Sequence, residues 1–208
     1  MTWIRLVPVA ALLALAGCGA GDAGGGPDVG DAADTGEDVV YQGAVTVLQD
    51  QERDAAELCG AVAESYPPQC GGLPVSGWDW DAVDHEEASG VRWGMYVVTG
   101  TFDGKSLVLT EEPVPTAEID MSEHPEWQYS EPELGDPAED LSVTELQAMA
   151  DEMAAEFPAI VFSGWADEQH GVAIVDTVLV TPELEAFAAE RYPEDTVAFS
   201  AMLNPVEE

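Results

Sequence analysis

The stretch VRWGMYVVTGTFDGKSLVL, residues 91–109, carries the strongest local structure signal in this chain. Large apolar and aromatic residues alternate along residues 91–102, which is typical of a β-strand. Asp103 and Gly104 follow at once, and the alternation resumes at Leu107 and Leu109. An Asp-Gly pair between two such segments predicts a β-hairpin with a type I′ turn, because both turn residues would need positive φ.

A small β domain is expected around this hairpin, over residues 41–117. Val45 and Val47 alternate with Thr46 and indicate a first strand. About five short strands in so short a segment favour a small barrel or curled sheet, including a barrel of the OB type.

The sequence of residues 141–208 predicts a helix, two strands, a second helix and a final strand, in the order α-β-β-α-β. Ser142 and Glu145 form a capping-box pattern at the start of the first helix, and Pro158 ends it. Thr181 precedes Pro182, which suits the first position of a second helix. Strands are expected at residues 159–165, 172–180 and 196–203. The fold class is therefore α+β, with a β-barrel-like domain followed by this smaller domain.

Two acidic segments flank the β domain. Residues 18–40 are rich in Gly and Asp and bury too little apolar surface to fold, so we expect a flexible linker. Residues 118–140 form a connector interrupted by prolines. It also contains Trp127 and Tyr129, and these aromatic residues indicate that part of the connector packs on a domain.

The N-terminus has the parts of a secretory signal: an early Arg5, an apolar run and then small residues. The run is shorter than the roughly 20 residues of a membrane-spanning helix. Leu15-Ala16-Gly17-Cys18 resembles the lipobox of bacterial lipoprotein precursors. This resemblance implies that residues 1–17 are a signal peptide and that Cys18 carries lipid on the extracytoplasmic face of the membrane. The alternative is an ordinary signal peptide with a chance cysteine.

The chain is strongly acidic, with 42 acidic and 5 basic residues and a net charge of −37 at pH 7. Nucleic acid is excluded as a partner, because binding it requires neutralisation of phosphates by Lys and Arg. Anionic headgroups are repelled as well, so lipid and not charge would hold the protein at a membrane. Salt adaptation and a compositional bias of the lineage both remain as explanations of the charge.

The other two cysteines, Cys59 and Cys70, form an even pair once Cys18 carries lipid. An oxidising compartment then favours a disulfide between them. A metal site is the alternative, although no histidine lies near either cysteine in the sequence.

The pattern Cys59-Gly60, then YPPQCGG at residues 66–72 and GWDW at residues 77–80, resembles a group of uncharacterised actinobacterial secreted proteins and lipoproteins. The similarity extends over residues 43 to about 112 and includes VTGTFDG at residues 98–104. It implies export and a disulfide-closed β domain, and it implies no activity. Leu73 stands where the pattern would have proline, which leaves the shape of that loop open.

The best candidate for a cation site is the acidic segment that contains Asp79, Asp81 and Asp84. Calcium prefers six to eight oxygen ligands, but the spacing does not match an EF-hand. An acidic loop on an acidic protein explains the same residues.

Trp78 and Trp80 lie two positions apart, so on a strand they would share one face. They form either an exposed aromatic platform for a polymer or part of the barrel core.

The sequence contains no G-x-S-x-G nucleophile motif, and it has too many carboxylates to single out a catalytic pair. No catalytic residue and no cofactor are assigned. We expect a membrane-anchored extracytoplasmic lipoprotein that is not an enzyme and that binds or scaffolds an unknown envelope protein or polymer. The alternatives are a hydrolase of envelope polymers and a divalent-cation-binding module.

Overall fold

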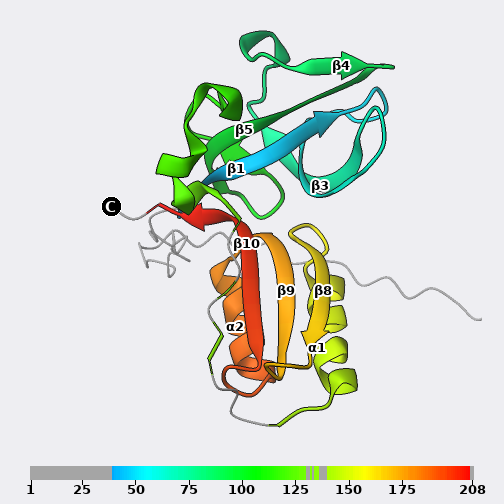
Figure 1. Cartoon of the computed structure of the whole chain (residues 1–208), viewed down its shortest axis with the longest axis vertical. Helices are drawn as coiled ribbons and strands as arrows, with labels where there is room; N and C mark the ends of the chain where they lie inside the picture. Colours follow the sequence, from blue (N-terminus) through cyan, green and yellow to red (C-terminus); the bar gives the residue numbers. More distant parts are fainter. Residues whose placement is uncertain (1–38, 130–131, 133, 136–139, 207–208) are drawn as a thin grey trace, which may run out of the picture. The chain divides into compact units, whose positions relative to one another are not determined.

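A closed barrel of five strands forms the first part of the computed structural model (Figure 1). Its strands are β1 (Val40–Gln49), β2 (Glu57–Ala63), β3 (Gln69–Ser76), β5 (Val91–Phe102) and β6 (Leu107–Leu109). Antiparallel pairs join β1 to β2 and β2 to β3, a parallel pair joins β3 to β6, and β6 pairs with β5. The long antiparallel pair of β5 with β1 closes the ring. The expectation of a small barrel is confirmed.

The structure describes residues 39–129, 132, 134–135 and 140–206, and these residues belong to one compact unit. The expected signal peptide, the lipidated Cys18 and nearly all of the expected linker lie outside the described residues. None of the described helices is long and apolar enough to span a membrane.

The predicted hairpin is present, but its turn is not of type I′. Phe102 pairs with Leu107, so residues 103–106 form a loop longer than a two-residue turn. Gly104 has a φ of +88°, whereas Asp103 does not have positive φ. The Asp103 carboxylate instead accepts the backbone N–H groups of Lys105 and Ser106, at 2.9 and 2.7 Å. This side-chain capping satisfies the loop without a second left-handed residue.

Alternating burial along β1 shows how the barrel builds its core, because every second side chain points inward. The same core cluster continues into the second part of the chain, where it includes residues of β9 and both helices. Its fully buried members include Val47, Leu58, Leu73, Tyr96, Val98, Leu107, Met153, Leu179, Leu184 and Leu203.

The predicted disulfide is confirmed. Cys59 on β2 is bonded to Cys70 on β3, with their Cα atoms 5.5 Å apart. Cys59 is 2% exposed and packs with Leu48 and Trp93 in a small apolar cluster. The bond therefore joins two neighbouring strands at a site where the ladder between them shifts register.

The second part consists of α1 (Val143–Glu156), β8 (Val161–Asp167), β9 (Val172–Leu179), α2 (Pro182–Arg191) and β10 (Val197–Pro205). β8 and β9 are antiparallel, while β9 and β10 are parallel, and Figure 1 shows both helices behind these strands. The capping box of Ser142 and Glu145 is present, and the Thr181 hydroxyl accepts the N–H of Leu184.

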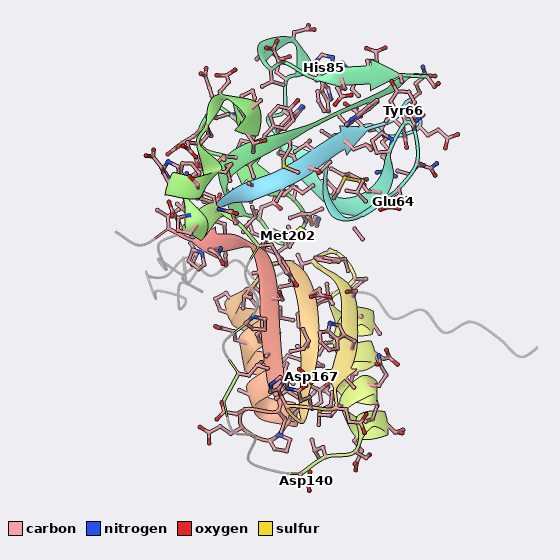
Figure 2. The ribbon with its side chains drawn as sticks, viewed as in Figure 1. Glu64, Tyr66, His85, Asp140, Asp167 and Met202 are labelled. Carbon is pink, nitrogen blue, oxygen red and sulfur yellow. A yellow bond between two sulfur atoms is a disulfide. The ribbon has the colours of Figure 1, made fainter. Side chains whose placement is uncertain are left out.

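The end of β10 joins the two parts, because Asn204 and Pro205 pair with Gln42 and Tyr41 of β1. Gly43 lets the strands approach closely, since a Cβ there would overlap the carbonyl oxygen of Met202. Figure 2 marks Met202 at this end of β10.

Short segments lie outside the main elements. β4 (Glu86–Ala88) and β7 (Val114–Pro115) pair with β5. The described residues also contain four single 3₁₀ turns, at η1 (Trp80–Ala82), η2 (Thr116–Glu118), η3 (Met121–Glu123) and η4 (Pro125–Trp127). The expected packing of the connector is confirmed, because the Trp127 indole donates to Gln42 Oε1 at 2.6 Å and the Tyr129 hydroxyl donates to Asp176 Oδ1 at 3.0 Å.

Candidate binding groove

β10 has a strand partner along one edge for most of its length. The N–H of Ala173 donates to the carbonyl of Thr196 at 2.9 Å. In a parallel ladder the residues that bond to one neighbour alternate with residues that point their N–H and C=O groups the other way. Val197, Phe199 and Ala201 therefore direct their backbone groups away from β9. Within the described part of the chain, no strand pairs with this edge before Asn204.

A cavity of about 590 Å³ lies along the same edge, and we name it the β10 groove. Side chains from β1, β9, α2 and β10 form most of it, and part of the connector closes one side. The lining residues are Val39, Tyr41, Pro132, Leu134, Gly135, Val172, Val180, Pro182, Glu185, Asp195, Val197, Ala198, Phe199 and Pro205. Most of these residues are apolar, so the groove offers surface that a ligand could cover.

The charged residues in this lining are Glu185 and Asp195, both acidic. A second hollow of about 470 Å³ continues between α2 and β10 and adds Glu194. The basic residue of α2, Arg191, is paired with Glu152 at 2.7 Å and lies over the Phe187 ring. The groove is therefore apolar along its walls and negative at its margins.

Tyr41 closes one end of the groove. The side chain is 3% exposed, and its hydroxyl donates to the carbonyl of Val180 at 2.9 Å. Burial raises the pKa of Tyr41 above 10.0, and the negative charges of Glu183 and Glu185 raise it further. Tyr41 is thus a neutral hydrogen-bond donor at neutral pH, and the first turn of α2 brings negative charge close to it.

Asp195 marks the opposite end, just before β10. Its backbone has a φ of +57°, a left-handed conformation that Asp adopts more readily than most residues. Gly135 of the connector lies against its side chain, where a Cβ would come within 3.2 Å of Asp195 Cγ. The absence of a side chain at Gly135 lets the connector approach this carboxylate.

A second exposed feature lies on β8. Trp165 is 49% exposed, and Ser163 two residues earlier donates a hydrogen bond to Asp176 Oδ2. The same carboxylate also accepts the hydroxyl of Tyr129.

The two tryptophans proposed as a platform lie against the barrel core. Trp80 is 5% exposed, and its indole donates to Gln49 Oε1 at 2.8 Å. Trp78 is partly buried and packs edge-on against Trp80 and Tyr96, at 5.2 and 4.9 Å between ring centroids. Arg92 lies over the Trp80 ring at 5.5 Å. Trp80 therefore has little free ring surface for stacking.

The acidic segment proposed for a cation holds itself together by other contacts. Asp79 Oδ1 accepts the N–H of Asp81 at 2.9 Å and so caps η1. The carbonyl of Asp84, not its carboxylate, accepts the hydroxyl of Tyr96 at 2.8 Å. Among the residues that the structure describes, no group of three or more His, Cys, Asp or Glu side chains could hold a metal ion.

Sequence reasoning did not find the β10 groove. The segment 196–203 reads as a strand, but the sequence does not show which other segments complete a cavity with it. Only the position of β10 beside β9, with residues of α2 and of the connector close to it, turns this strand into one wall of a cavity.

We compared the chain with protein families, curated proteins and solved structures. No family model matches the chain, and no curated protein or solved structure shows significant similarity to it.

Proposed function

We propose that this protein is a membrane-anchored extracytoplasmic lipoprotein that binds a partner without catalysing a reaction, and that the β10 groove is its binding surface. The observation that carries the binding role is the groove itself, an apolar cavity beside backbone groups of Val197, Phe199 and Ala201 that no strand in the described residues pairs. Apolar walls suit the capture of a ligand by burial.

Two features support the location. The Cys59–Cys70 disulfide fits an oxidising compartment outside the cytoplasm. The sequence Leu15-Ala16-Gly17-Cys18 resembles a lipobox, and a lipid on Cys18 would supply the membrane affinity that a net charge of −37 opposes.

The finer assignment of the fold is part of this proposal. The strand order β1-β2-β3-β6-β5, closed by the pair of β5 with β1, supports a barrel of the OB type, because that fold is a small five-stranded Greek-key barrel. The elements from α1 to β10 then form the α-β-β-α-β part. The C-G…PPQCGG…WDW pattern supports membership of the actinobacterial secreted group.

The test of the anchor is Cys18→Ser in cells supplied with a labelled fatty acid. Wild type should incorporate label and sediment with membranes, whereas the variant should do neither, because the thiol that carries the lipid is gone. The control is the double variant Cys59→Ala with Cys70→Ala, which removes the other thiols and should still be labelled. Unchanged labelling of Cys18→Ser would overturn the proposal.

A further inference from the structure

We infer that the outer face of the barrel carries a second docking surface, which binds an amphipathic, basic helix of another protein. The surface lies on and beside β5, comprises Tyr66, Trp93, Met95, Val97 and Val114, and is named the β5 strip. None of these residues lines the β10 groove, so the inference goes beyond the proposed function. Its support comes from the exposed apolar side chains, the paired backbone beneath them and the charges around them.

Strand geometry and contacts join the members of the β5 strip. Trp93, Met95 and Val97 alternate with core residues of β5 and therefore point outward from the barrel. Val114 of β7 pairs directly with Val97, so its side chain lies on the same face. The Tyr66 ring packs edge-on against Trp93, with 5.8 Å between the ring centroids. The five side chains therefore form one continuous surface.

Three side chains of the strip are large, apolar and open to solvent. Tyr66 is 79% exposed, Met95 55% and Val114 40%, whereas Trp93 and Val97 are buried and form the floor of the strip. Apolar side chains that gather on an acidic surface favour a protein partner, because covering them removes apolar area from water. A tyrosine ring is a frequent anchor of protein interfaces, and a methionine side chain adapts its shape to a partner.

The turn that carries Tyr66 is held in place on both sides. The Cys59–Cys70 disulfide joins the two strands that lead into and out of it. The Arg53 guanidinium donates to the carbonyl of Cys70 at 2.5 Å and ties the same turn to the loop after β1. A side chain on a turn held in this way loses little conformational freedom when a partner binds.

The backbone beneath the strip decides which kind of element binds. β5 pairs with β1 along one edge from Arg92 to Thr101, and with β4 and β7 along the other edge on either side of Met95. The hydroxyl of Thr116 donates to the carbonyl of Met95 at 3.2 Å. The partner therefore does not add a strand here and covers the face with side chains. A helix does so well, because its apolar side chains recur about every 5–6 Å along one face, close to the roughly 7 Å between alternate residues of a strand.

The acidic residues around the strip select a basic partner. Glu86 pairs directly with Trp93 across β4 and β5, and its side chain is exposed. Glu64 lies two residues before Tyr66, is also exposed, and is marked with Tyr66 at the same end of the barrel in Figure 2. Carboxylates thus stand beside the apolar side chains at this end of the strip.

Positive charge does not offset these carboxylates. Arg53 is paired with Asp50 and Glu57, and Arg92 lies over the Trp80 ring. A helix with Lys or Arg beside its apolar face therefore complements the strip, whereas an acidic helix or a second copy of this chain is repelled.

The experiment immobilises the full-length chain by its C-terminus and measures the binding of synthetic helical peptides by surface plasmon resonance, below the micelle concentration of the detergent. The parent peptide carries leucine along one face of the helix and arginine along the other. A second peptide has the same composition in an order that leaves no apolar face, and a third has glutamate in place of arginine. The parent should bind at least tenfold more tightly than the second peptide, and the third should not bind.

Matched variants locate the binding on the protein. Tyr66→Ser with Met95→Gln removes two exposed apolar side chains from the strip, and Trp165→Ser with Val143→Gln removes one aromatic and one aliphatic exposed side chain outside it. The strip variant should bind the parent peptide about tenfold more weakly, and the control variant should match wild type. Melting temperatures close to that of wild type check that both variants fold.

A charge comparison separates the strip from general attraction to an acidic protein. Glu64→Gln with Glu86→Gln removes two charges beside the strip, and Glu168→Gln with Glu190→Gln removes two at exposed positions outside it. The first variant should bind the parent peptide several-fold more weakly at low salt, and the second should match wild type.

Four results would overturn the inference. Equal binding of the parent and the reordered peptide would show attraction between charges without an apolar contact. Equal loss in the strip and control variants would place the binding elsewhere, and no binding of the parent peptide would show that the strip accepts no helix. A dimer that light scattering detects in wild type and not in the strip variant would assign the strip to a second copy of the chain. None of these results bears on the fatty-acid labelling of Cys18, so failure here is distinguishable from failure of the proposed function.

Discussion

The hydroxyl of Tyr41, near the start of the first barrel strand, donates a hydrogen bond to the carbonyl of Val180, which lies 139 residues later and 2.9 Å away. Val180 follows β9 and immediately precedes the cap residue of α2, so this bond ties the barrel to the helix-containing part of the chain. Tyr41 is buried, and among the described residues its hydroxyl is the only side-chain donor to this carbonyl.

Tyr41→Phe should lower the free energy of unfolding by about 1 kcal/mol, because it leaves the carbonyl of Val180 without that donor and keeps the ring packing. Denaturant unfolding followed by tryptophan fluorescence measures this change. Tyr66→Phe is the control, because Tyr66 is 79% exposed and its variant should match wild type. Equal stability of Tyr41→Phe and wild type would show that water replaces the donor.

Two adjacent glycines on β3 should differ strongly in how far an added methyl group destabilises the protein. A Cβ on Gly72 would overlap the carbonyl oxygen of Leu58, whereas a Cβ on Gly71 would meet nothing within 4 Å. Gly72→Ala should therefore destabilise the protein by about 3 kcal/mol, because the β2–β3 ladder must move apart. Gly71→Ala should stay within about 0.5 kcal/mol of wild type. Similar melting temperatures for the two variants would contradict the close approach at Gly72.

Removing the disulfide should cost about 3 kcal/mol, the value expected for cysteines separated by 11 residues. The variant Cys59→Ala with Cys70→Ala tests this without placing a polar atom in the cluster with Leu48 and Trp93. Guanidinium unfolding of the variant and of wild type, with and without reductant, gives the difference. Reductant should destabilise wild type and leave the variant unchanged, and a variant as stable as wild type would refute the estimate.

Stability should fall as the pH rises between 10 and 12. Burial raises the pKa of Tyr96 to about 12, and the charge of Asp84 adds to the shift. The unfolded chain releases the tyrosine proton near pH 10, so above this pH the folded state holds more protons than the unfolded state. The stabilisation is therefore complete below pH 10 and is lost as the pH rises through the folded pKa.

The measurement is the free energy of unfolding against pH, in wild type and in Tyr96→Phe. The variant lacks the titrating group, so its curve should be shallower between pH 10 and 12. Tyr192, whose pKa is also raised to about 12 by burial and by Glu152, is retained in both proteins and keeps part of the slope. Parallel curves for the two proteins would show that Tyr96 titrates normally in the folded state.

Local signals in the sequence predicted several elements correctly. The capping box at Ser142 and the Thr181-Pro182 start of the second helix act within a few residues, and both are present in the structure. The Asp103-Gly104 hairpin was predicted, but its turn type was wrong, because the Asp103 side chain satisfies the loop in a way that the dipeptide alone does not reveal. Such details depend on the exact backbone path and not on residue type.

The candidate groove could not be predicted in the same way. Its walls come from Tyr41, Leu134, Val180 and Phe199, which are far apart in the chain and carry no shared motif. The tryptophans at positions 78 and 80 were conspicuous in the sequence, but Trp80 is buried because η1 turns it toward Tyr96. Residue type alone does not distinguish a buried aromatic side chain from an exposed one.

The sequence by itself determined the features that depend on near neighbours: the helix caps, the alternating strands, the central hairpin and the even pair Cys59 and Cys70. Only the tertiary structure decided that β5 returns to β1 and closes the barrel, and that β10 keeps one edge unpaired among the described residues. The physical reason is that strand pairing joins backbone groups, which every residue carries, across long stretches of chain. The choice of partner therefore depends on how all the apolar faces pack together, and no short segment contains that information.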